Sequence, residues 1–128
     1  MGPIRTLVFI AALSVAAVSC GSDSPSSPSG GNDGTIAATL TISATGISPK
    51  TVTVPVGSRV TIINNDTKSH NMNSDPHPEH TQCPALNVGV LASGQSRTSQ
   101  NLTTARACGM HDHDDSDNAN WKATITVQ

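Results

Sequence analysis

The chain has 128 residues, a net charge of −2 at pH 7 and no patch of basic residues, which argues against nucleic-acid binding. Only 2% of the residues are aromatic, and after Phe9 the single aromatic residue is Trp121. The core must therefore consist of Val, Ile, Leu and Ala, with Thr and Ser on the strands. No nucleophile–base order, phosphate loop or paired-carboxylate pattern is present, so we expect a protein that is not an enzyme.

The first twenty residues predict a signal peptide. Arg5 gives a basic start, and the apolar run at 7–18 is too short to span a bilayer comfortably. The run ends in AVSC at 17–20, which resembles the cleavage motif of bacterial lipoproteins, where the cysteine is lipidated. This resemblance implies that Cys20 anchors the protein in the bacterial cell envelope, facing the periplasm, and Gly21 favours the outer membrane. An ordinary cleaved signal peptide is the alternative.

Residues 21–34 read GSDSPSSPSGGNDG and contain no apolar residue that can pack. Such a composition is typical of a flexible tether. The remaining residues, 35–128, are enough for one domain. We therefore expect three parts, a signal peptide (1–20), a tether (21–34) and a folded domain (35–128), with the lipid as the only contact with the membrane.

Alternation of apolar and polar residues with a period of two predicts strands in the domain. Pro55 cannot donate a ladder hydrogen bond, so the strand that contains it is expected at a sheet edge. No segment has helical periodicity, which favours an all-β Greek-key sandwich or barrel with antiparallel strands. The segment 67–84 lacks a regular pattern, and the acidic segment 112–120 is expected to be a solvated loop. The predicted strands are 36–44, 51–56, 59–64, 88–91, 96–102, 104–108 and 122–127.

Potential ligands for a soft metal gather in the second half of the domain, where all five histidines lie between positions 70 and 113. Thiolate and imidazole suit copper or zinc and suit calcium or magnesium poorly. Cys108 and His111 follow a predicted strand and can turn toward one ion if the chain reverses there. The alternative for two cysteines in an oxidising compartment is a disulfide between Cys83 and Cys108.

Four segments resemble the cupredoxins of the plastocyanin and azurin group, over nearly all of 36–128. They are ISPKTVTVPVGSRVTI from position 47, Asn-Asp at 65–66 followed by His70, the Cys108-x-x-His111 motif, and a closing TITV strand. The resemblance implies a cupredoxin-like fold and one copper ion held by His70, Cys108 and His111. A site of two imidazoles and one thiolate suits one-electron transfer with a redox partner protein.

The axial ligand departs from the family pattern. No methionine follows His111, so the axial position is either empty or filled by a backbone oxygen, Met72 or Met110. Both methionines are also natural packing residues.

The segment 74–84 also departs from the pattern, as an insertion that carries His77, His80 and Cys83. These side chains either form a second site, reshape the first or are solvated. If Cys83 pairs with Cys108, the thiolate is lost, and the copper site must be all-histidine, for example His70, His111 and His113.

Three functions therefore remain open on the sequence. The first is a copper protein that transfers one electron in the periplasm. The second keeps the fold but carries or sequesters copper at a histidine-based site, and exchanges it with a copper donor or acceptor. The third is a metal-free interaction domain stabilised by a disulfide.

Overall fold

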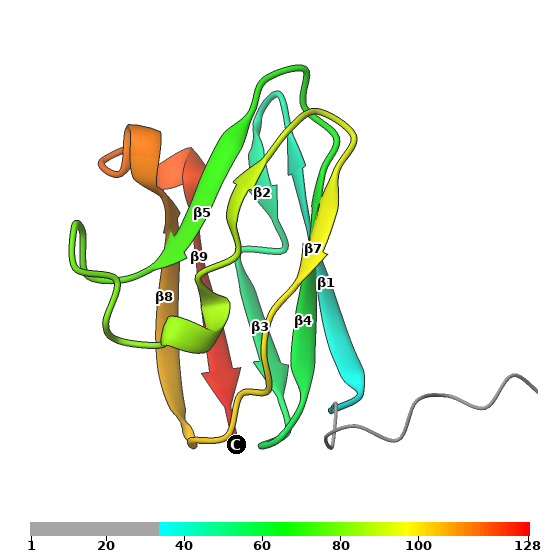
Figure 1. Ribbon diagram of the computed structural model, residues 1–128, viewed down its shortest axis with the longest axis vertical. Helices are drawn as coiled ribbons and strands as arrows, with labels where there is room; N and C mark the ends of the chain where they lie inside the picture. Colours follow the sequence, from blue (N-terminus) through cyan, green and yellow to red (C-terminus); the bar gives the residue numbers. More distant parts are fainter. Residues whose placement is uncertain (1–33) are drawn as a thin grey trace, which may run out of the picture. The chain divides into compact units, whose positions relative to one another are not determined.

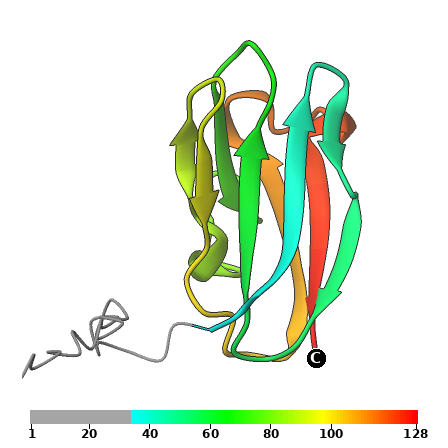
Figure 2. The ribbon, with the colours of Figure 1, turned by 90° about the vertical axis from the view of Figure 1, so that its right-hand side faces the viewer.

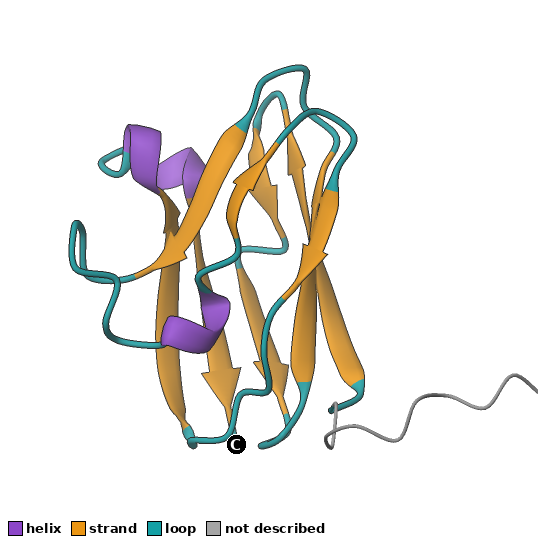
Figure 3. Ribbon diagram, in the orientation of Figure 1, coloured by secondary structure: helices purple, strands orange, loops and turns teal. Residues whose placement is uncertain are grey.

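The computed structural model describes residues 34–128. The predicted signal peptide with Cys20, and all of the predicted tether except Gly34, lie outside the described residues. The described chain folds into two β-sheets joined by loops and short 3-10 turns (Figures 1 and 3). No helix within residues 34–128 has the length and apolar character needed to cross a membrane. The elements are β1 (Ile36–Ser43), β2 (Gly46–Ser48), β3 (Thr51–Val54), β4 (Arg59–Asn64), β5 (His70–Ser74), η1 (Pro84–Leu86), β6 (Gly89–Leu91), β7 (Ser96–Thr98), β8 (Arg106–Asp112), η2 (His113–Asp115), η3 (Ala119–Trp121) and β9 (Lys122–Val127).

The strand order is β2-β1-β4-β7 in one sheet and β3-β9-β8-β5-β6 in the other. The predicted all-β sandwich is confirmed, and β3 lies at a sheet edge as its neighbouring Pro55 indicates. The expectation of antiparallel strands is wrong for two pairs, because β1–β4 and β3–β9 run parallel. Figure 2 shows the reason: β2 continues into β3 of the other sheet without reversing, so β4 returns parallel to β1.

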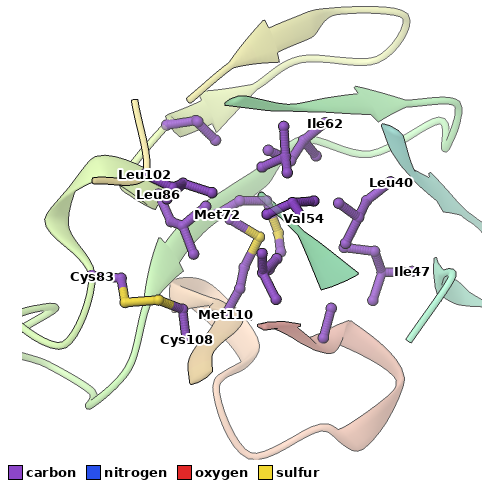
Figure 4. Close-up of a cluster of buried hydrophobic side chains, with 14 of the residues drawn as sticks. Leu40, Ile47, Val54, Ile62, Met72, Cys83, Leu86, Leu102, Cys108 and Met110 are labelled. Carbon is purple, nitrogen blue, oxygen red and sulfur yellow. A yellow bond between two sulfur atoms is a disulfide. The ribbon is translucent and has the colours of Figure 1, made fainter. Parts of the chain in front are cut away.

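The core lies between the sheets and is built from the inward positions of the alternating strands (Figure 4). In β4, Val60, Ile62 and Asn64 are buried and alternate with partly exposed residues. Met72 and Met110 are both buried in this core, which makes them packing residues. Burial of each large aliphatic side chain contributes roughly 1.5–3 kcal/mol to the driving force for folding.

Two strands differ from the sequence-based expectation in ways that decide the site. β5 forms within the segment 67–84, where its inward residues are His70, Met72 and Ser74, so only one apolar residue marks the strand. β8 does not end near Cys108 but continues to Asp112. The expected strands at 88–91 and 96–102 are present with shorter bounds, as β6 and β7, and β9 has the expected bounds.

Candidate metal centre

Cys108 and His111 lie on opposite faces of β8. Cys108 pairs with Ile125 and His111 with Lys122 in the same continuous ladder with β9. Successive side chains of a strand point to opposite faces, so residues three apart cannot converge on one ion. The prediction that the chain reverses after Cys108 is therefore wrong. Cys108 faces the core between the sheets, and His111 faces the other side.

Cys108 forms a disulfide with Cys83, with a Cα–Cα distance of 5.8 Å (Figure 4). Both residues are buried. The disulfide ties the loop that follows β5 to the middle of β8. Of the two alternatives that the sequence left open, the structure has the disulfide, so neither sulfur is a thiolate that can bind a metal.

His70, expected to be the first imidazole ligand, is held between two carboxylates instead. Its Nδ1 lies 2.7 Å from Oδ2 of Asp112, and its Nε2 lies 3.0 Å from Oδ2 of Asp66. All three residues are buried, and the ring of Trp121 packs 4.5 Å from the imidazole, centroid to centroid. Both ring nitrogens are therefore engaged by carboxylates. The structure does not bring His70, Cys108 and His111 together.

Asp112 was expected in a solvated loop and is instead the buried last residue of β8. Its Oδ1 accepts hydrogen bonds from the backbone N–H groups of Asn71 (3.0 Å) and Asp114 (3.1 Å). Together with the contact to His70, these bonds satisfy the buried carboxylate. They also fix the backbone where β8 passes into η2.

The hydrogen bond from His70 and the backbone N–H of Thr67 lower the pKa of Asp66 from its ordinary value of 3.8. A carboxyl whose pKa is lower in the folded state stabilises the fold above its unfolded pKa, and this contribution is lost as the pH falls through the folded pKa. We expect Asp66→Asn to be less stable than the wild type at pH 7, with a difference that shrinks below about pH 4. Urea denaturation at pH 7 and pH 3 measures this. An equal difference at both pH values would contradict it.

Three other histidines meet beside β8. His77 and His80 lie in the loop after β5, which leaves the sheet next to β8 (Figure 1), and His111 lies on the outward face of β8. Ligand nitrogens of the three side chains all lie within 4.8 Å of one another. His77 is exposed, His80 is half-buried and His111 is buried. The sequence marked the insertion as a possible site, but with Cys83 as the third member where the structure places His111.

His111 is oriented by a carboxylate. Its Nδ1 donates to Oδ1 of Asp75 over 2.6 Å, while its Nε2 is buried and, among the described residues, has no hydrogen-bond partner. A buried nitrogen without a partner is costly and uncommon. With the proton on Nδ1, the lone pair of Nε2 is free for a metal, the arrangement in which a carboxylate holds a metal-binding histidine.

Gly109 makes room for this carboxylate. A Cβ atom at position 109 would collide with Oδ2 of Asp75 and lie 2.6 Å from its Cγ. The backbone N–H of Asp75 donates to the carbonyl of Gly109 (3.0 Å), and Gly109 donates to the Gln82 side chain (2.8 Å). Two hydrogen bonds at Gly109 thus join the loop to β8 beside the disulfide.

His80 has the left-handed backbone conformation, with φ +55°, which is uncommon for a residue other than glycine. Its Nδ1 lies 2.8 Å from the carbonyl oxygen of Ser74, to which a ring N–H donates. The carbonyl of His80 accepts from the hydroxyl of Ser74 (3.1 Å) and the amide of Asn87 (3.0 Å). The remaining nitrogen, Nε2, lies 2.7 Å from Nδ1 of His113.

The donor set fits a transition metal. Nitrogens at 2.0–2.1 Å from one tetrahedral ion lie about 3.3 Å apart, so three atoms within 4.8 Å of one another need only small adjustments to share an ion. Imidazole ligands suit zinc, copper, nickel and iron, whereas magnesium and calcium prefer oxygen. The hydrogen bond to Asp75 leaves Nε2 of His111 without a partner among the described residues, and the bond to Ser74 leaves Nε2 of His80 facing His113.

Comparison with solved structures places this domain among proteins of one fold. It aligns with the purple cupredoxin of Nitrosopumilus maritimus at a TM-score of 0.57 and 22% identity, covering 71% of this chain and 99% of that chain. It aligns with oxidised plastocyanin of Dryopteris crassirhizoma at a TM-score of 0.55 and 18% identity, covering 70% of this chain and 99% of that chain. It aligns with auracyanin of Roseiflexus castenholzii at a TM-score of 0.54 and 16% identity, covering 71% of this chain and 95% of that chain. No protein-family model and no curated protein matches the sequence. The domain of residues 34–128 has the cupredoxin fold.

Proposed function

We propose that this protein binds one copper ion through His77, His80 and His111, and that it carries or sequesters the metal. The observation that carries the proposal is Nε2 of His111, which is buried, lacks a partner among the described residues and is held by Asp75 beside two further imidazoles. The fold supports copper in particular, because one solved structure with this fold is an amicyanin variant described with Cu(I). Copper(II) is also the divalent first-row ion that nitrogen sites bind most tightly.

The position of the histidines favours exchange of the metal over permanent enclosure. His77 is exposed and His80 is half-buried, so one side of the cluster faces solvent. A donor or acceptor protein can reach a copper ion from this side. Because both sulfurs are in the disulfide, the intense charge-transfer colour of a copper–thiolate bond is not expected.

One-electron transfer is the second candidate, and the fold favours it. Solved structures with this fold include oxidised and reduced plastocyanin and dithionite-reduced auracyanin. A bound copper ion would supply the Cu(I)/Cu(II) couple. The chain would hold the ligands on β8 and on a loop joined to it by a disulfide, and a redox partner protein would exchange the electron.

We also propose that the protein works in the cell envelope of a bacterium, anchored through Cys20 and facing the periplasm. The disulfide supports an oxidising compartment, since such bonds rarely persist in the cytosol. The AVSC motif at 17–20 supports the anchor. Release of the Cys20→Ser variant from the membrane fraction is the expected result, and wild-type protein with an unmodified Cys20 would refute the anchor.

Titration of the purified protein with Cu(II) tests the function. We expect one equivalent to bind, with a pale ligand-field band and no intense visible absorption, because the ligands are imidazoles. Calorimetry gives the stoichiometry, and the visible spectrum identifies the ligand class. Absence of saturable binding would favour the metal-free interaction domain. An intense blue or purple colour would show a thiolate ligand and restore the electron-transfer site predicted from the sequence.

A further inference from the structure

His113 lies next to the three-histidine cluster, and the proposed three-ligand site gives it no role. Its Nδ1 lies 2.7 Å from Nε2 of His80, and its ring lies 4.6 Å from the ring of His77, centroid to centroid. It is half-buried and begins η2, directly after β8. It stands outside the compact group of His77, His80 and His111, but it touches two of its members.

The backbone that carries His113 is fixed from the core side. Asp112 caps η2 through its bond with the N–H of Asp114 and is held by His70 and by the N–H of Asn71. Asp112 points into the core. The side chains of its neighbours His111 and His113 therefore point to the opposite side of the chain. The buried Asp112 therefore places both imidazoles beside the loop that carries His77 and His80.

The contact between His80 and His113 involves the nitrogen that the metal requires. Nδ1 of His80 is engaged by the carbonyl of Ser74, so only Nε2 is left for coordination, and this atom faces Nδ1 of His113. Two imidazole nitrogens 2.7 Å apart share one proton in a hydrogen bond. An ion bound to both would hold them about 3.3 Å apart, so the pair needs to open by only about half an ångström.

We propose that His113 is the fourth ligand of the copper site, bound through Nδ1, so that four imidazoles close the coordination shell. This inference rests on the proposed function and deepens it. Four protein ligands in a tetrahedral arrangement fill the coordination shell, unlike catalytic sites with three protein ligands and one open position. The closed shell suits a carrier or an electron-transfer protein and excludes small anions from the metal.

Pulsed electron paramagnetic resonance on the Cu(II)-loaded wild-type protein counts the coordinated imidazoles directly. Four imidazoles, with no spectral change on addition of azide, is the expected result. Three imidazoles, or a new azide-to-copper absorption band in the wild type, would overturn the inference while leaving the three-histidine copper site intact. Failure of the wild type to bind copper would overturn the proposed function itself.

The His113→Gly variant gives the second test, with Asp114→Gly as its matched control in the same turn. Asp114 is exposed and contributes its backbone N–H, which glycine keeps. We expect His113→Gly to bind copper about 10- to 100-fold more weakly, to show an azide band, and to recover wild-type spectra when free imidazole is added. The control should behave as the wild type. Wild-type affinity and azide resistance in His113→Gly would overturn the inference.

Discussion

Replacement of His111 by alanine is expected to lower the affinity for Cu(II) by at least about 100-fold, the largest effect of any single substitution in the cluster. His111 is the one buried member of the three-histidine group, and its Nε2 has no other partner among the described residues. Its loss removes the ligand that is fixed to the sheet. Only the two loop histidines of the group then remain, and one of these is exposed. Competition titration with a chelator of known copper affinity measures the change.

The Asp75→Asn variant is expected to lose copper affinity to an intermediate degree. The asparagine keeps the size of the side chain but lacks the charge that holds the proton on Nδ1 of His111. We expect a loss of about 10- to 100-fold, smaller than that of His111→Ala, because the ligand remains. Circular dichroism of both variants controls for folding. If His111→Ala binds copper like the wild type, the ion lies elsewhere and the cluster is not the site.

Removal of the disulfide is expected to have the second large effect, on stability and on copper binding together. The bond joins residues 25 positions apart. The loop-closure entropy of a loop of this length corresponds to about 3.5 kcal/mol of stability. In the double variant with Cys83→Ala and Cys108→Ala, we expect urea denaturation to show a loss near this value. Copper affinity should also fall, because the loop that carries His77 and His80 loses its covalent tie to β8.

The single variant Cys83→Ser separates the two readings of Cys108. If Cys108 were a copper ligand, the freed thiol would give an intense visible colour with Cu(II). The structure predicts no such colour, because Cys108 faces the core while His111 faces the other side of β8. The spectrum of the loaded variant decides between them, and a strong band that disappears on further replacement of Cys108 would contradict the structure.

The sequence alone predicts the class of fold and the region of the candidate site. Alternating Val, Ile and Thr predict β4 and β9 directly, because one face of each strand packs in the core and leaves a period-two pattern. The clustering of histidines after position 70 likewise pointed to a metal in the second half of the chain. Both signals are local, so a single sequence carries them.

Which residues form the candidate site depends on contacts between distant parts of the chain. β5 has a single inward apolar residue, Met72, because its other inward positions are His70 and Ser74. His70 is satisfied there by Asp66 and by Asp112, and Asp112 comes from another strand. That pairing also buries Asp112 at the end of β8 and extends the strand past Cys108. The register then sends Cys108 to the core and His111 to the opposite face, toward the loop histidines. Pairing between distant segments sets this register, and no local pattern of Cys-x-x-His can express it.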